Sequence, residues 1–224
     1  MPDDRYLRTH PLSHVPILYP ALFYDDCNGT LPYSATGDGA DYIAAYQTVA
    51  PLAGTKQLRL QTRTTGPTTG DAVTIALHTF LTPAKLLRLI AHFKTYQSPP
   101  HSILYFAFHW YDGTNQHLAI IRLRTDEADV AYYGPAPNYT TLSGVTFNPT
   151  TGHWHRLDFA INVADALYHR LTFDHNIANM QSIAIPTTAD ATLPHLRLIV
   201  TLETTQNALA YCALDQILLL AENP

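Results

Sequence analysis

The chain has 224 residues, of which 46% are hydrophobic and only 14% are charged, and its formal net charge is −5. This negative balance argues against a nucleic-acid-binding protein, because such proteins present a basic surface to the phosphates. The start of the chain is polar and no apolar run is long enough for a transmembrane helix. We therefore expect no secretory signal and no membrane partner.

Residues 1–20 are predicted to form an extended arm. Four prolines (Pro2, Pro11, Pro16 and Pro20) remove backbone donors that a regular ladder needs. An arm of this kind usually lies on a protein surface, which is a first indication of assembly. We expect residues 21–224 to form one domain, because no linker-like stretch divides them.

Short segments with alternating apolar and polar residues follow the arm and recur along the chain, as in β-strands. The segment 85–94 has apolar residues at both helical and strand spacing, and its neighbours favour a strand. The predicted strands cover residues 21–26, 42–47, 56–62, 73–80, 85–94, 102–124 (a hairpin), 130–133, 155–161, 168–173, 182–185, 196–202 and 208–219.

The hairpin from His101 to Arg124 carries the strongest local signal. Two aromatic-rich apolar runs flank Asp112-Gly113-Thr114-Asn115, and the Asp-Gly pair tolerates the positive φ of a tight turn. About a dozen short strands separated by turns are typical of an antiparallel sandwich or barrel. The sequence therefore predicts an all-β protein.

The two cysteines, Cys27 and Cys212, lie near opposite ends of the chain. In a reducing compartment both would be buried thiols, which is the reading we favour. The alternative is one disulfide that joins the first and last strands.

Four local patterns resemble the concanavalin A-like superfamily of laminin-G domains and glucanases. They resemble, in order, its F-x-D-D-F-x-G opening strand, its G-x-x-S-L-x-L strand, its W-H-R strand and its closing I/V-D-D-I/V strand. In this chain they are Phe23–Gly29, Gly54–Leu60, His153–Leu157 and Leu214–Ile217. The resemblance implies a two-sheet antiparallel jelly-roll β-sandwich whose last strand lies beside the first.

The same resemblance implies a structural calcium ion near the first and last strands. Asp25, Asp26 and Asp215 occupy the matching positions, and carboxylates are the ligands that calcium prefers. The alternative is that these acids accept hydrogen bonds from turn amides. Gln216 stands where the family has a second acid, which weakens the metal prediction. We expect no other cofactor.

Aromatic residues offer candidate ligand-binding platforms, because their rings can stack on sugar rings. The candidates are Trp110, Tyr111, Tyr132, Tyr133 and Tyr139. Aromatic residues are also favoured in strands for packing alone, so core packing is the alternative.

Several histidines are candidate zinc ligands. His153 and His155 share a strand face, and His169, Asp174 and His175 follow within a hairpin's reach. However, the face of His155 is otherwise apolar, so we expect structural or surface histidines.

The acidic residues provide no pair for glycoside hydrolysis, which needs two carboxylates about 5–9.5 Å apart. Jelly-roll glucanases supply them as Glu-x-Asp-x-x-Glu, whereas Glu127, Glu203 and Glu222 are the only glutamates here. Asp126, Glu127 and Asp129 cluster in a predicted hairpin turn. We therefore expect no enzymatic activity.

The first hypothesis is a non-catalytic structural or interaction protein of a phage virion, such as a decoration, tail or fibre-associated protein. Its partners would be copies of itself or other virion proteins, and it would reach the virion from the host cytoplasm. The alternative is a carbohydrate-binding, lectin-like module in the cytoplasm or at a cell surface, with glycans as partners. A glycoside hydrolase ranks third, since this fold hosts all three classes.

Overall fold

The computed structural model describes residues 21–48, 51–52, 54–81, 84–96, 101–136, 138–149 and 152–222, so the predicted arm lies outside the described residues. Within these ranges there is no helix that could cross a membrane. The regular elements are strands: β1 (Ala21–Asp25), β2 (Ser34–Gly37), β3 (Ile43–Gln47), β4 (Gln57–Gln61), β5 (Ala72–Thr79), β6 (Leu86–Thr95), β7 (Ser102–Tyr111), β8 (Asn115–Arg124), β9 (Asp129–Tyr133), β10 (Tyr139–Thr141), β11 (His155–Asn162), β12 (Leu167–Phe173), β13 (Asn176–Asn179), β14 (Thr187–Ala189), β15 (His195–Thr204) and β16 (Tyr211–Glu222).

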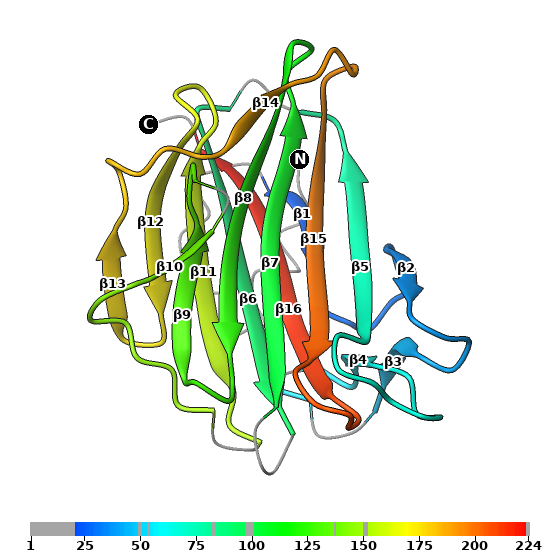
Figure 1. Cartoon of the computed structure of the whole chain (residues 1–224). Helices are drawn as coiled ribbons and strands as arrows, with labels where there is room; N and C mark the ends of the chain where they lie inside the picture. Colours follow the sequence, from blue (N-terminus) through cyan, green and yellow to red (C-terminus); the bar gives the residue numbers. More distant parts are fainter. Residues whose placement is uncertain are drawn as a thin grey trace.

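The strands form two antiparallel sheets that lie face to face, as the sequence predicted (Figure 1). The back sheet has the order β13-β12-β11-β6-β16-β4-β3, and β1 also pairs with β16. The front sheet has the order β10-β9-β8-β7-β15-β5-β2, and β14 also pairs with β8. In Figure 1 the front sheet, with β7, β8 and β15 at its centre, lies before β6 and β16.

The core lies between the two sheets and is built from the inward half of each alternating strand. The Phe108 ring of the front sheet lies 5.3 Å from the Phe159 ring of the back sheet, and Phe106 lies 5.6 Å from Phe93. All four side chains are fully buried. Burial of this apolar surface is the main force that holds the layers together.

The first and last strands lie side by side, as the resemblance implied. β1 pairs with the second half of β16, with Ala21 opposite Leu220 and Asp25 opposite Ile217. The first half of β16 pairs with β4 instead. Between the two halves, Gln216 adopts a positive φ of 54° at a register shift against β6. Because of this irregularity, the two halves of β16 pair along one edge with two different short strands, β4 and β1.

Both thiols are buried and free. The Cys27 thiol lies 3.6 Å from the Leu214 carbonyl oxygen, to which it donates. The reduced-thiol interpretation is therefore confirmed, and the first and last strands are held by backbone pairing instead of a disulfide.

Several local predictions are confirmed and others are wrong. The ambiguous segment 85–94 is a strand, and Gly113 has the positive φ expected of the hairpin turn. Residues 182–185 are not a strand; Ala184 makes only an isolated bridge to Leu167. The short strands β2, β10, β13 and β14 were missed, because three or four residues carry too little alternation to be recognised.

Candidate functional site

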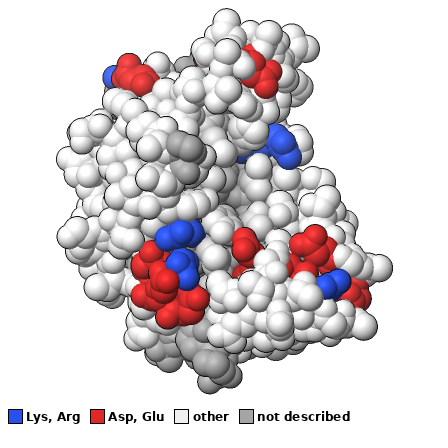
Figure 2. All heavy atoms as spheres, viewed as in Figure 1, with Lys and Arg blue, Asp and Glu red and all other residues white. Residues whose placement is uncertain are grey.

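The outward side of the front sheet, called the front face below, carries a two-dimensional array of partly exposed aromatic, polar and charged side chains. Cross-strand partners in a sheet share a face, so the strand registers fix which residues are neighbours. The middle of the array is formed by Ala76, Ala107, Ile120 and Ile199. Figure 2 looks at this face and shows it uncharged and hollowed in its middle, with charged side chains towards its ends.

One end of the face, the tyrosine end, is built by Tyr105, Arg122, Tyr133, Tyr139 and Glu203. Tyr133 pairs with Tyr139, and Tyr105 pairs with Arg122. The Arg122 guanidinium lies 4.4 Å from the centre of the Tyr139 ring, and the Tyr105 hydroxyl donates to Glu203 at 3.2 Å. Burial raises the pKa of Tyr139 to about 12, so its hydroxyl stays a donor at neutral pH.

The arginines of this end are paired with acids of the same hairpin. Arg122 contacts Asp129 at 3.1 Å, and Arg124 contacts Glu127 at 2.7 Å and Asp126 at 3.4 Å. Figure 2 shows these opposite charges gathered over the β8–β9 hairpin. The hairpin interpretation of this acidic stretch is therefore confirmed, and its carboxylates are neutralised locally.

The opposite end, the histidine end, is built by His78, His109, Tyr111, His195 and Arg197. Arg197 lies between His109 on β7 and His78 on β5 in the sheet register. The His195 ring stacks on Tyr111, with centroids 4.3 Å apart, and His109 lies 4.8 Å from the same ring. Burial, with the nearby Arg197 and His195 charges, lowers the pKa of His78 and His109 below the ordinary value.

Two of the five predicted platform residues belong to the core, which corrects the prediction for them. Trp110 is fully buried and stacks on His117 with centroids 4.6 Å apart. Tyr132 points inward and meets Tyr168 edge-on at 5.6 Å. The reason is strand alternation, because Trp110 and Tyr132 each precede a residue that points outward.

The other three, Tyr111, Tyr133 and Tyr139, do lie on the front face, but not together. Tyr133 and Tyr139 belong to the tyrosine end, whereas Tyr111 belongs to the histidine end. The sequence reasoning missed Tyr105, Arg122, Glu203, His78, His109, His195 and Arg197. The alternation of Tyr105, Ala107, His109 and Tyr111 along β7 was the available signal for two of them.

No protein-family model and no curated protein matches the chain in sequence. Solved structures do match in fold. The carbohydrate esterase vb_24B_21 from the Shiga toxin-encoding bacteriophage phi24B has a TM-score of 0.58 and 20% identity, over 86% of this chain and 90% of that one. The calcium-bound exoplasmic/lumenal domain of VIP36 has a TM-score of 0.55 and 13% identity, over 86% and 84%. The potassium-bound carbohydrate recognition domain of Emp46p has a TM-score of 0.51 and 9% identity, over 89% and 95%.

The chain has the concanavalin A-like jelly-roll fold. This is the fold that the four sequence motifs implied. Identities this low establish the architecture only, so the chemistry of the site must be argued from the residues of this chain.

In this concanavalin A-like jelly roll, the acids predicted to hold calcium are used by the chain's own donors. Asp25 accepts from the Cys27 amide and the Tyr46 hydroxyl, each at 2.7 Å. Asp26 accepts from the Asn28 amide at 3.1 Å, and Asp215 accepts from the Leu52 amide at 2.8 Å. No group of three acids, histidines or cysteines suited to a metal occurs among the described residues. These contacts support the alternative that the acids accept hydrogen bonds from amides, and the calcium ion stays a prediction.

One of the candidate zinc-binding histidines, His155, is structural. His155 is buried, and its Nδ1 lies 2.8 Å from Asp174. Its ring packs against Phe93, Phe147 and Phe173. The prediction of a structural histidine is therefore confirmed at this position.

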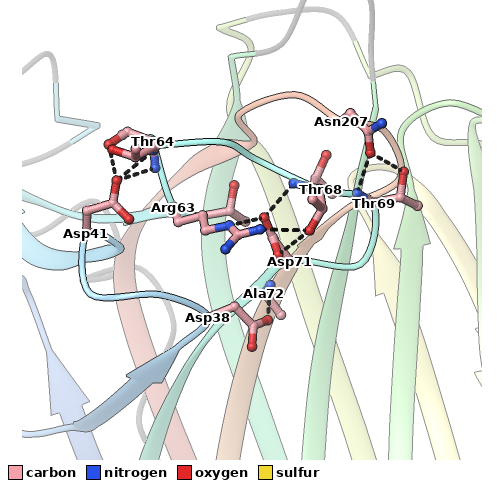
Figure 3. Close-up of polar contacts among 12 residues, drawn as sticks. Asp38, Asp41, Arg63, Thr64, Thr68, Thr69, Asp71, Ala72 and Asn207 are labelled. Carbon is pink, nitrogen blue, oxygen red and sulfur yellow. Dashed lines mark hydrogen bonds and ion pairs between the residues drawn. The ribbon is translucent and has the colours of Figure 1, made fainter.

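The loops at one end of the sandwich form a polar network that also contains acids (Figure 3). Asp41 accepts from the Thr64 hydroxyl at 2.5 Å and from the amides of Thr64 and Thr65 at 3.0 and 2.7 Å, and these contacts lower its pKa to about 2. Asp71 accepts from the Arg63 Nε at 2.7 Å. These acids fix the loop conformation, and the front face remains the better candidate for ligand binding.

Proposed function

We propose that the front face binds glycans and that the protein acts without catalysis. The observation that carries this proposal is the tyrosine end, where three partly exposed tyrosine rings lie beside a guanidinium and a carboxylate. Tyrosine combines a flat apolar ring with a hydroxyl and loses little conformational entropy on binding. A sugar presents an apolar ring face and hydroxyl groups at its rim, so it complements this arrangement.

Support also comes from the solved structures. VIP36 was determined with Man2 and with Man3GlcNAc, and the matching part of Emp46p is a carbohydrate recognition domain. A binding role without catalysis is favoured because the carboxylates at the tyrosine end are engaged. Asp129 pairs with Arg122, and Glu203 accepts from Tyr105, whereas glycoside hydrolysis needs a protonated acid free to reach the leaving oxygen.

The test is a glycan array with the purified full chain, followed by calorimetric titration of the best neutral oligosaccharide. We expect Tyr133→Ala and Tyr139→Ala to weaken binding about tenfold, in line with the loss of one anchoring aromatic contact. Tyr211→Ala is the matched control, because Tyr211 is a partly exposed tyrosine of the back sheet that stacks on Tyr96. Equal loss in all three variants, or no binding to any glycan, would contradict the proposal. Released sugar or acetate during incubation would contradict its non-catalytic part.

We also propose that the protein is a virion component. The observation that favours this location is the match to a phage protein over 86% of the chain. The low charge content of 14% is compatible with faces that are covered by neighbouring proteins. Mass spectrometry of purified particles from the source should find the polypeptide in stoichiometric amounts, and its absence from the particles would refute this location.

A further inference from the structure

The histidine end contains an arginine that the chain itself does not neutralise. Arg197 is partly buried, and no carboxylate lies within ion-pair distance of it among the described residues. Its Nε is shielded from solvent and has no hydrogen-bond partner. A shielded guanidinium without an anion has lost part of its hydration and gained no partner in return.

Most other described arginines contrast with Arg197. Arg88 contacts Asp158 and Glu222, Arg63 contacts Asp71, and Arg122 contacts Asp129. Five described arginines thus have an acid beside them, whereas Arg197, like Arg59 and Arg170 of the back sheet, has none among the described residues. On the front face, Arg197 is therefore the arginine that contrasts with Arg122.

The groups that face Arg197 on the neighbouring strands are histidines and not carboxylates. His109 and His78 are its partners on the two adjacent strands, and His195 lies two residues before it on β15. The nearby acid is Asp190, which is partly exposed and accepts from the amide and hydroxyl of Thr192 at 2.9 and 2.6 Å. Its negative charge opposes the lowering of the His109 pKa, but it forms no ion pair with Arg197.

Neutral donors and acceptors complete the surroundings. The Nε2 of His109 lies 3.3 Å from the Gln116 Oε1, and Tyr111 presents its ring between His109 and His195. An arginine with three histidines and a tyrosine around it can offer several donors to one oxyanion. Guanidinium geometry suits the two oxygens of a carboxylate or sulfate in particular.

We propose that the histidine end binds the oxyanion of an acidic sugar, a carboxylate or a sulfate, with Arg197 as the central ligand. The inference rests on the proposed glycan-binding function and specifies its ligand class. His109 lies four positions after Tyr105 on β7, which corresponds to about 13 Å along the strand. An oligosaccharide that crosses the front face could thus contact the tyrosine end with a neutral sugar and the histidine end with an acidic one.

The experiment compares four polymers by calorimetric titration: polygalacturonic acid, its carboxyl-reduced form, chondroitin sulfate and its desulfated form. We expect the protein to bind polygalacturonic acid, or chondroitin sulfate, with higher affinity than the neutralised form of the same polymer. The pair that shows the difference identifies the anion as carboxylate or sulfate. We expect Arg197→Gln to weaken binding of the preferred polymer about tenfold or more, and to leave binding of the neutral oligosaccharide unchanged.

Arg170→Gln is the matched control, because Arg170 is a partly buried arginine of the back sheet. A second readout is pH, since protonation of His78 and His109 adds positive charge. Binding of the acidic polymer should be tighter at about pH 5.5 than at about pH 7.5.

The outcomes separate this inference from the proposed function. If Arg197→Gln and Arg170→Gln weaken acidic-polymer binding equally, the polymer is held by general charge and the inference is wrong. If acidic polymers bind no better than their neutralised forms while Tyr133→Ala still weakens neutral binding, the inference fails and the proposed function stands. If no polymer or oligosaccharide binds, both fail.

Discussion

The two ends of the front face are built from the same sheet but differ in whether their arginine is paired with an acid. At the tyrosine end, Arg122 has Asp129 beside it and lies over the Tyr139 ring. At the histidine end, Arg197 has histidines as its neighbours on both adjacent strands. Figure 2 shows the opposite charges of the tyrosine end gathered over the β8–β9 hairpin. An arginine that is paired with an acid of the same chain, such as Arg122, stabilises the fold. An arginine without such an acid, such as Arg197, can bind an anionic ligand instead.

The largest expected effect is a loss of stability caused by a substitution in the core beneath both ends of the front face. Phe108 is fully buried directly beneath the middle of the front face, between Ala107 and His109. Phe108→Ala should lower the free energy of unfolding by about 3–5 kcal/mol, because it removes a large buried ring and leaves a cavity. Urea denaturation measures this loss. Neutral and acidic glycan binding should weaken together, and survival of one without the other would show that the two ends are independent of the shared core.

A smaller difference in the free energy of unfolding should distinguish substitutions of Arg122 and Arg197. Arg122→Gln should lower the free energy of unfolding by about 1–3 kcal/mol, because Asp129, whose side chain is 13% exposed, loses its ion partner. Arg197→Gln should change it by less than about 0.5 kcal/mol, because no ion pair is broken. The same denaturation experiment serves for both variants, and equal losses would remove the contrast between the ends.

The pH dependence of stability provides a reference outside the front face. Burial and the nearby Arg156 lower the pKa of His92, on the back sheet, to about 4. In the unfolded chain His92 titrates near its ordinary value of about 6.5, so the unfolded state binds the proton first as the pH falls. The stability that neutral His92 contributes is therefore present above about pH 6.5 and is lost on the way down to about pH 4. Denaturation series at several pH values should show this decline, and His92→Gln should flatten it; an unchanged slope would contradict the assignment.

The smallest effect concerns the histidine end itself. The Arg197 charge contributes to the lowered pKa of His78 and His109, after burial. Arg197→Gln should therefore raise the pKa of both histidines by a fraction of a unit. NMR titration of the histidine ring protons measures the change, with His92 as an internal control that should not move. A bound acidic sugar should raise the same two pKa values, because an anion favours the protonated rings.

Most of the architecture could be predicted because it depends on local chemistry. Alternation along the long strands, the Asp112-Gly113 turn and the motifs at Phe23–Gly29 and Leu214–Ile217 led to two sheets with adjacent first and last strands. The same alternation could have excluded Trp110, since it shares its face with the buried Phe106 and Phe108. Aromatic content alone does not separate inward from outward rings, whereas the position of each ring in the alternation does.

The candidate site was harder to predict because it depends on which strands are neighbours. His78, His109 and Arg197 come from three strands that are far apart in the sequence, and only the order β7-β15-β5 brings them together. The predicted calcium ligands Asp25, Asp26 and Asp215 do lie near the paired ends of the chain. Each accepts a hydrogen bond from a backbone amide, and Asp25 also accepts from the Tyr46 hydroxyl, contacts that the sequence alone could not specify.

The position of β16 in the middle of the back sheet has a consequence for biosynthesis. A ribosome produces β4 and β6 long before β16 (Tyr211–Glu222). Neither strand can therefore form its pairing with β16 until the end of synthesis. Until then their open backbone edges can pair with other nascent chains, which is a route to aggregation. We therefore expect translation arrest before Tyr211 to yield insoluble fragments, and chaperone supply during expression to improve the recovery of folded protein.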